Sequence, residues 1–173
     1  TVQQQPMGLM CSFSSGVGIT PSSGTMPASN VTTTALVCSP QSYTLGGSVS
    51  GLTSGTLVLA NGSDTVSVTS DGSFQMPTAV AYGASYAVTV LTAPFGLTCT
   101  VSNGSNTMPA QDVSNVSVLC APTTYTIGGS ISNLIGSGLV LANGSDTLNV
   151  AAKANSFTVP TSETSGSTYN VTV

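Results

Sequence analysis

The sequence repeats itself after about the length of one small β-domain. The stretch GGSVSGLTSGTLVLANGSDTVSV, which starts at Gly46, returns as GGSISNLIGSGLVLANGSDTLNV, which starts at Gly128. Tyr43 recurs as Tyr125, which lies 82 residues later. Such self-similarity predicts a repeat architecture in which each period folds as one unit. Repeat arrays usually build length or surface, so the sequence favours an architectural role over an active site.

Both ends of the chain fall at the same phase of this repeat. The opening run up to Cys11 aligns with the run up to Cys99, and the closing run Tyr169–Val173 aligns with Tyr86–Val90. The sequence therefore predicts three regions. They are the C-terminal part of one unit at residues 1–40, a complete unit at residues 41–121, and the N-terminal part of a further unit at residues 122–173, with Pro40 and Pro122 at the joints.

Neither partial unit contains a whole β-sandwich, and an open sheet edge with an uncovered apolar face favours aggregation. Three arrangements would complete these parts. Identical neighbouring repeats of a longer polypeptide are the first. In the second, the tail of one copy completes the head of the next copy by strand complementation, which propagates into a filament because the contact is heterologous. In the third, the two parts meet within one chain as a permuted second domain.

Apolar residues alternate with Ser and Thr along most of the chain, which predicts strands and no helices. The segment around Asn61-Gly62 is typical of a tight hairpin, because both residues tolerate a positive φ, and it recurs at Asn143-Gly144. Seven short strands in the complete unit predict an antiparallel two-sheet sandwich. The expected strands are 43–50, 56–60, 65–69, 73–76, 85–91, 98–102 and 113–119. Recurring aromatic residues at strand positions are expected in the core: Tyr43, Tyr86, Tyr125, Tyr169, Phe74 and Phe157.

Three motifs carry a family resemblance. They are the strand at Gly47–Val49, the Asp-Gly turn at Asp71–Phe74 and the Tyr/Val strand at Gly83–Val90. In this order they resemble transthyretin-like, or carboxypeptidase-regulatory-like, domains. The cysteine-bearing segment that follows resembles an addition in tandem immunoglobulin-like repeats of bacterial surface proteins. The resemblance implies an antiparallel immunoglobulin-like or transthyretin-like sandwich in an extracellular array, and it implies no chemistry.

The four cysteines occupy equivalent places in the two copies of the repeat. Cys11 aligns with Cys99 and Cys38 aligns with Cys120, so each pair brackets the same stretch. Four cysteines allow three pairings, and the repeat symmetry selects Cys11–Cys38 and Cys99–Cys120. A metal site is poorly supported, because the chain has no CxxC spacing and no histidine. Disulfides indicate an extracellular or cell-surface location; the alternative is buried free thiols.

The charge content excludes several classes of partner. Charged residues make up 3% of the chain, and Lys153 is the single basic residue. Nucleic-acid binding needs clustered Lys or Arg, and the apolar runs are too short to span a bilayer, so neither nucleic acid nor membrane insertion is expected. The polar surface consists of hydroxyls and amides. Such a surface suits either a soluble extracellular domain or a protein that packs against itself or carries sugars.

Catalytic chemistry has little support in the sequence. A serine nucleophile needs a base such as histidine, which is absent. Asp64 and Asp71 are the best candidates for a carboxylate pair, but Asp64 recurs as Asp146 beside a turn, and Asp71 aligns with Ala154. Lys153 lies in the loop that differs between the copies. We therefore expect no enzyme, no cofactor and no metal; with so few acids, a calcium site is not expected either.

Six N-x-S/T sequons occur, at Asn30, Asn61, Asn103, Asn115, Asn143 and Asn170. Asn61 and Asn143 are the first candidates for glycosylation, because hairpin tips are usually accessible. The leading hypothesis is a structural repeat of an extracellular filament, sheath or surface stalk whose partner is itself, with glycan decoration as an addition. The competing hypothesis is an adhesin that contacts glycans or host proteins, and a third is an accessory domain of a secreted enzyme.

Overall fold

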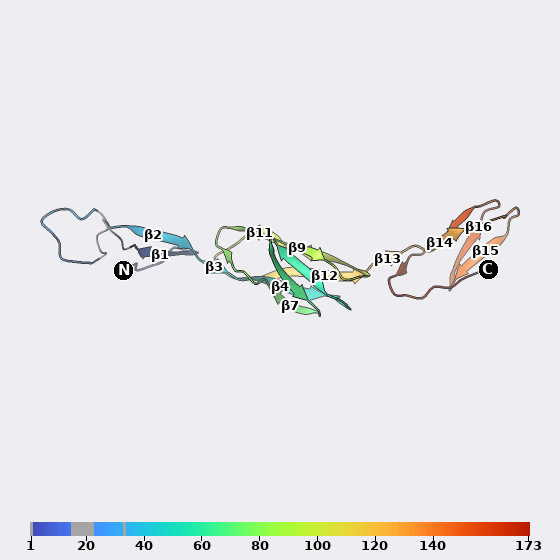
Figure 1. Ribbon diagram of the computed structural model, residues 1–173, viewed down its shortest axis with the longest axis horizontal. Coiled ribbons are helices and arrows are strands. Elements are labelled where there is room, and N and C mark those ends of the chain that lie inside the picture. Colours follow the sequence, from blue (N-terminus) through green and yellow to red (C-terminus); the bar gives the residue numbers. More distant parts are fainter. Residues whose placement is uncertain (1, 15–22, 33) are drawn as a thin grey trace. The chain divides into compact units, whose positions relative to one another are not determined.

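A computed structural model describes residues 2–14, 23–32 and 34–173, and across them the expected all-β fold class is confirmed (Figure 1). The described residues form strands, turns and loops, without a helix. Thr1, Thr33 and residues 15–22, which belong to the expected first partial unit, lie outside the described residues. The chain divides into two compact units, Thr1–Thr92 with Thr100–Leu119, and Ala93–Cys99 with Cys120–Val173. The boundaries expected near residues 40 and 121 stay a prediction.

The strands follow the two copies of the repeat in order. The first twelve are β1 (Leu9–Phe13), β2 (Leu36–Pro40), β3 (Ser42–Tyr43), β4 (Leu45–Ser50), β5 (Leu57–Asn61), β6 (Asp64–Val68), β7 (Gly72–Gln75), β8 (Val80–Ala81), β9 (Ser85–Thr92), β10 (Leu97–Ser102), β11 (Ser105–Thr107) and β12 (Val113–Pro122). The others are β13 (Thr124–Tyr125), β14 (Gly128–Ser130), β15 (Leu139–Asn143), β16 (Asp146–Val150), β17 (Ser156–Thr158), β18 (Glu163–Thr164) and β19 (Val171–Thr172). Six of the seven expected strands of the complete unit are present as single strands, whereas the one expected at 43–50 is split into β3 and β4, which lie in different sheets. The sequence pattern did not predict the short strands β8 and β11.

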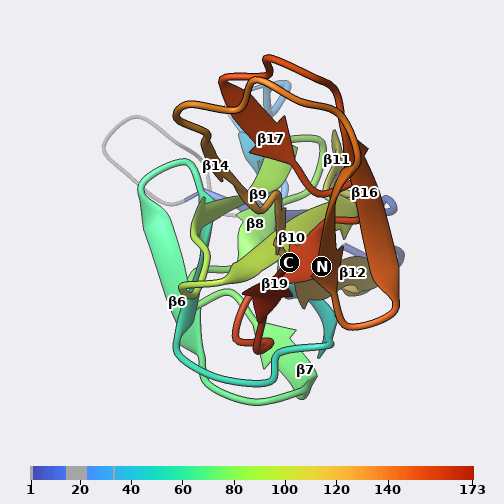
Figure 2. The same ribbon diagram turned by 90° about the vertical axis from the view of Figure 1, so that its right-hand side faces the viewer.

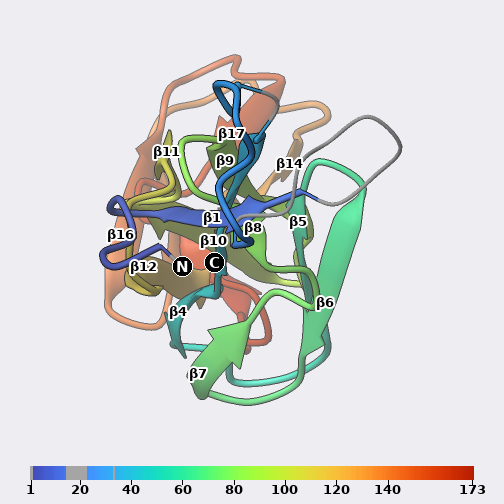
Figure 3. The same ribbon diagram turned by 90° about the vertical axis from the view of Figure 1, so that its left-hand side faces the viewer.

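Two four-stranded sheets, which we call the middle sandwich, contain most of the core. Their strand orders are β10-β12-β4-β7 and β11-β9-β5-β6. In Figure 3, β4 lies beside β7 and β5 lies beside β6, as their antiparallel registers require. The core takes alternate residues of each strand, since successive side chains point to opposite faces. The most deeply buried side chains are Leu45, Leu57, Leu59, Met76, Met108, Val116 and Val118.

One strand pair departs from the expected antiparallel arrangement. β12 runs parallel to β4, with Val116 opposite Gly47 and Val118 opposite Val49. The alternation of apolar and polar residues specifies which face of a strand is buried. It does not specify the direction of the neighbouring strand, so the sequence pattern could not predict this pair. The expectation of a wholly antiparallel sandwich is therefore wrong at β4 and β12.

Both predicted hairpins are present, but their turns are shifted by one residue. Asn61 pairs with Asp64 across the β5–β6 hairpin, so Gly62 and Ser63 form the two-residue turn. Gly62 has a φ of 62°, which a glycine adopts without steric cost. The β15–β16 hairpin repeats this arrangement, with Gly144 at a φ of 59°. The asparagine is thus the last strand residue, and its side chain is free for another role.

The second unit contains smaller sheets, of which β14 and β17 are visible in Figure 2. β14 pairs with β17, β13 pairs with β18, and β15 lies between β16 and β19. The expectation that the recurring tyrosines are core residues holds for Tyr86 and fails for Tyr125 and Tyr169, which are exposed. Tyr86 has β11 beside it, with Asn106 directly opposite. Among the described residues, β19 has one strand neighbour in its sheet, which is β15.

Candidate functional site

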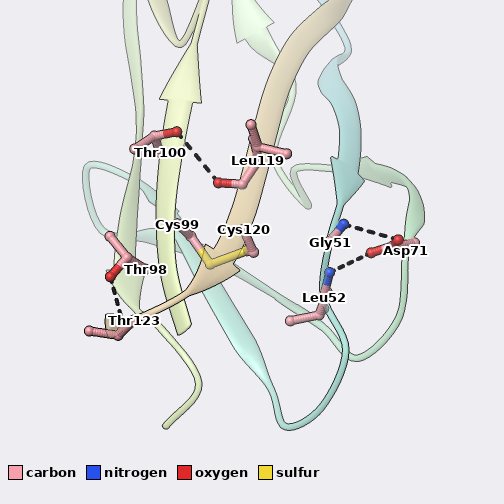
Figure 4. Close-up of a disulfide and its surroundings, with 9 residues drawn as sticks. All are labelled: Gly51, Leu52, Asp71, Thr98, Cys99, Thr100, Leu119, Cys120 and Thr123. Atoms are coloured by element: carbon pink, nitrogen blue, oxygen red, sulfur yellow. Dashed lines mark hydrogen bonds between the residues drawn. A yellow bond between two sulfur atoms is a disulfide. The ribbon is translucent and has the colours of Figure 1, made fainter. Parts of the chain in front are cut away.

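Each copy of the repeat joins two strands through a disulfide. Cys11 and Cys38 lie directly opposite each other on β1 and β2 and are bonded. Cys99 and Cys120 join β10 to β12 (Figure 4). These are the two pairs that the repeat symmetry predicts. Their sequence separations are 27 and 21 residues, so each bond stabilises its segment by about 3 kcal/mol in the chain-entropy model.

The candidate carboxylates are used by the backbone of separate loops. Asp64 Oδ2 accepts a hydrogen bond from Thr78 N at 3.0 Å. Asp71 accepts from Gly51 N at 3.0 Å and from Leu52 N at 2.7 Å, as Figure 4 shows. Both side chains therefore satisfy backbone donors that a loop would otherwise leave to water. This role is structural, and it explains why these two positions hold a carboxylate.

Lys153 and the possible metal ligands do not form a further candidate site in the described residues. Lys153 lies exposed in the turn before β17 and has a φ of 62°. Within residues 2–14, 23–32 and 34–173, no group of three or more His, Cys, Asp or Glu side chains is placed to hold a metal ion.

The two first-choice glycosylation candidates do not lie at the tips of their hairpins, so the expected turn position is corrected and glycosylation itself stays a prediction. Asn61 is half-buried, and its Oδ1 accepts from Ala87 N at 2.8 Å. Asn143 is only 9% exposed. Its Nδ2, the atom that a glycan would occupy, donates to Glu163 Oε1 at 2.8 Å. The physical reason is the shifted turn, which places each asparagine inside the strand pair.

The asparagine bonds recur with the repeat. Asn143 Oδ1 accepts from Asn170 N at 2.9 Å, as Asn61 Oδ1 does from Ala87 N at 2.8 Å. In both copies the amide side chain at the end of the first hairpin strand bonds the backbone of the strand beside it in the sheet. Ala87 lies within β9, and Asn170 directly precedes β19. The sequon and turn patterns did not predict this role, although the exact return of the LVLANGSDT run was a signal for it.

A second recurring arrangement lies at the residues that follow Pro40 and Pro122. The backbone of Gln41 donates to Gly8 O at 2.8 Å and accepts from Tyr82 N at 2.7 Å. We call this arrangement the Gln41 link.

The second copy has the same arrangement at Thr123. Its backbone donates to Gly96 O at 2.8 Å and accepts from Ser165 N at 2.8 Å, which we call the Thr123 link. Gly8 and Gly96 have φ values of 72° and 77°, so both turns use a conformation that favours glycine. The two links are therefore the same local structure built from different side chains.

One strand edge in the second unit has no strand partner in the described structure. β14 pairs with β17 on one side, and we call its other side the β14 edge. Gly128, Gly129 and Ser130 are all exposed, whereas the equivalent residues of β4 include Gly46 and Gly47, which are buried.

The N-terminal region contains the second copy of the sequence that lies beside β4. Residues 23–40 align with residues 105–122, which include β11 and β12. Met26, Val31 and Leu36 are exposed, whereas the aligned Met108, Val113 and Val118 are buried. We call residues 23–32 and 34–40 the 23–40 segment. Its apolar side chains therefore have no core to enter within the described residues.

An aromatic groove lies in the second unit. It is lined in part by Phe95, Tyr125, Tyr169 and Glu163. The three aromatic side chains are exposed. Glu163 Oε2 also accepts from Ser167 Oγ at 3.2 Å, so the carboxylate is held at the groove by two hydrogen bonds.

Comparison with protein-family models, with curated proteins and with solved structures finds no match to this chain. The resemblance to transthyretin-like and immunoglobulin-like repeats therefore stays a prediction drawn from its motifs. Within the described residues, the structure has no helix with the length and apolar character needed to cross a membrane.

Proposed function

We propose that this chain is a non-enzymatic structural repeat of an extracellular filament, sheath or surface stalk. In this proposal, β-sandwich units are completed by neighbouring copies or repeats. The partner is then the chain itself, and the assembly is periodic because the sequence is periodic.

The recurrence of the Gln41 and Thr123 links carries the proposal. The two central residues differ, as do Tyr82 and Ser165, yet the backbone hydrogen bonds are the same. A periodic assembly needs the same local geometry at each joint, whereas an active site needs particular side chains at one place. The features that return in this chain are turns, links, disulfides and strand registers, all of which serve architecture.

The disulfides support the extracellular part of the proposal. Disulfides persist in oxidising environments and are rare in the reducing cytosol. Both copies of the repeat carry one, and the described cysteines are all bonded. The low charge also fits, because a surface of hydroxyls and amides presents little repulsion between identical copies.

Electron microscopy of the purified, oxidised chain tests the proposal. We expect filaments with a regular axial repeat that grow with protein concentration. A monodisperse monomer over the same concentration range would contradict the proposal. Imaging after reduction of the disulfides is the companion measurement. We expect reduction to shorten or abolish the filaments, because β2, which leads into the Gln41 link, belongs to a two-stranded sheet that the Cys11–Cys38 bond holds together.

The aromatic groove favours a second candidate function, an adhesin that binds glycans. Exposed aromatic rings beside a carboxylate suit a sugar, which presents apolar C–H faces and hydroxyl donors. A glycan array with the wild-type chain and a Phe95→Ala variant tests this function. Selective binding that the variant loses would favour the adhesin. Phe95 is almost fully exposed, so we expect the variant to keep its fold.

A further inference from the structure

We propose that the β14 edge accepts, in parallel, residues 31–32 and 34–37 of a second copy of this chain. The inference rests on the proposed function and names the interface through which the copies join. The middle sandwich supplies the template, because it contains both sequences already paired: β4 is the first copy of β14, and β12 is the copy of residues 31–40.

The template fixes how closely the two strands approach. Gly47 lies directly opposite Val116, and a Cβ at Gly47 would overlap the Val116 carbonyl oxygen and its backbone neighbours. Glycine is therefore required at this position by the strand that lies beside it. Any larger residue would push β12 away from β4.

The second copy retains this glycine, although the described residues place no such strand beside it. For Gly129, the three atoms nearest to an added Cβ all belong to the Phe157 ring, a side chain and not a backbone. The described neighbours of β14 thus give a weaker reason for glycine than those of β4. A parallel strand on the β14 edge would supply the same reason as β12 does for Gly47.

The 23–40 segment matches this edge in its exposed side chains. Met26 is 73% exposed, whereas the aligned Met108 is 1% exposed. Leu36 is 52% exposed, whereas the aligned Val118 is fully buried. The side chains that would enter a core on pairing are therefore already presented to solvent.

The ends of the interface also match in their polar groups. In the middle sandwich, Asp112 Oδ1 accepts from Thr44 N at 2.8 Å, just before β4. Asn30 occupies the place of Asp112, and Thr126 occupies the place of Thr44. The amide oxygen of Asn30 is an acceptor of the same kind, so it can take the same backbone donor.

The register follows residue by residue from the template. Each β12 residue is replaced by its equivalent one period earlier, and each β4 residue by its equivalent one period later. The resulting pairs are Val31 opposite Ile127, Thr34 opposite Gly129, Ala35 opposite Ser130, Leu36 opposite Ile131 and Val37 opposite Ser132. Because the two surfaces differ, each copy both donates a segment and offers an edge. Such a heterologous contact yields an open series of oligomers unless it closes into a ring.

Two adjacent residues give a matched test. Leu36 and Val37 are 52% and 54% exposed, so replacing either should leave the single chain folded. Their template partners differ, since Val118 is fully buried and Leu119 is 57% exposed. We expect Leu36→Ser to weaken self-association at least about tenfold, and Val37→Ser to change it by less than about twofold, as measured by sedimentation velocity over a concentration series.

The β14 edge has its own variant and control. Gly129→Ala places a methyl group where the partner backbone must pass, and we expect it to weaken association as strongly as Leu36→Ser. Gly136→Ala is the control, because the space around Gly136 is open. Circular dichroism of each variant checks that the single chain remains folded. In the wild-type oligomers, amides of residues 128–132 should exchange hydrogen more slowly than in the monomer.

The outcomes separate this inference from the proposed function. A wild-type oligomer series that Leu36→Ser and Gly129→Ala both suppress, with the two controls unaffected, supports the interface. Filaments that persist in these two variants overturn the interface and leave the proposed function standing. A wild-type chain that stays monomeric overturns the second copy as the occupant, and it contradicts the proposed function as well.

Discussion

β4 and β14 have nearly the same sequence and very different surroundings. β4 lies between β12 and β7, and Leu45, Gly46 and Gly47 are buried there. β14 has β17 on one side, and its three residues are exposed. The comparison teaches that burial in this protein depends on which neighbours a strand has, because the strand sequence itself is almost constant.

The sharpest way to break this comparison is to add a methyl group at the equivalent glycines. We expect Gly47→Ala to destabilise the middle sandwich by more than about 3 kcal/mol, because the new Cβ meets the Val116 backbone, which cannot rotate away. Gly129→Ala should cost the single chain less than about 1 kcal/mol, since the Phe157 ring can shift. Urea unfolding followed by circular dichroism measures both values, and equal losses would contradict the assigned neighbours.

The next largest effect concerns the aligned methionines. Met108→Ala should cost about 2–5 kcal/mol, because it leaves a cavity in the core of the middle sandwich. Met26→Ala should change the stability of the single chain by less than about 0.5 kcal/mol, because Met26 is exposed. The two variants differ only in position, so thermal melts of both at low protein concentration make a controlled pair. A costly Met26→Ala would mean that this residue is already in a core.

Removing the disulfides one at a time compares the two sheets whose strands they join. Each loss should cost about 3 kcal/mol locally, but with different results. β1 and β2 form a two-stranded sheet, which is marginal alone, so the Cys11→Ser/Cys38→Ser variant should lose this pair. β10 and β12 belong to a four-stranded sheet and should remain paired in the Cys99→Ser/Cys120→Ser variant.

Hydrogen exchange measures that difference, strand by strand. We expect fast exchange in β1 and β2 of the Cys11→Ser/Cys38→Ser variant, and slow exchange in β10 and β12 of the Cys99→Ser/Cys120→Ser variant. The reverse order would show that the disulfide, and not the sheet, holds β12 in place.

The smallest effect is expected at the two equivalent asparagines. Asn61→Ala removes one hydrogen bond, to Ala87 N, and should cost about 1 kcal/mol. Asn143→Ala removes bonds to both Asn170 N and Glu163, so it should cost about twice as much. Urea unfolding resolves this difference, and Asn61→Asp, which retains the acceptor oxygen, is the matched control for the first variant.

The strands were predictable because alternation and turn residues mark them directly. The run Tyr86–Val90 alternates large apolar residues with the small residues Ala87 and Thr89, and β9 contains it. β11 escaped prediction because its residues, Ser105–Thr107, are all polar, and a strand at the edge of a sheet needs no apolar alternation. The parallel pairing of β12 with β4 was not predictable for another reason. The relative direction of two strands depends on the path of the chain between them, which residue alternation within a strand does not specify.

The side-chain roles were less predictable than the strands. The return of Asn61 as Asn143 indicated that the residue matters, but a sequon and a hairpin turn both explain an Asn-Gly-Ser run. The choice between them depends on a turn shifted by a single residue, which places the side chain within reach of Ala87 N. The links at Gln41 and Thr123 use only backbone atoms, so no side-chain pattern marks them.

The parallel pair at the centre of the middle sandwich has a mechanical consequence. The chain passes from the Gln41 link into β4, and it leaves through β12 toward the Thr123 link. Tension applied through the two links pulls the start of β4 and the end of β12 in opposite directions along parallel strands. The hydrogen bonds between them are then strained in shear and must fail together, whereas an antiparallel pair pulled at adjacent ends would unzip one bond at a time.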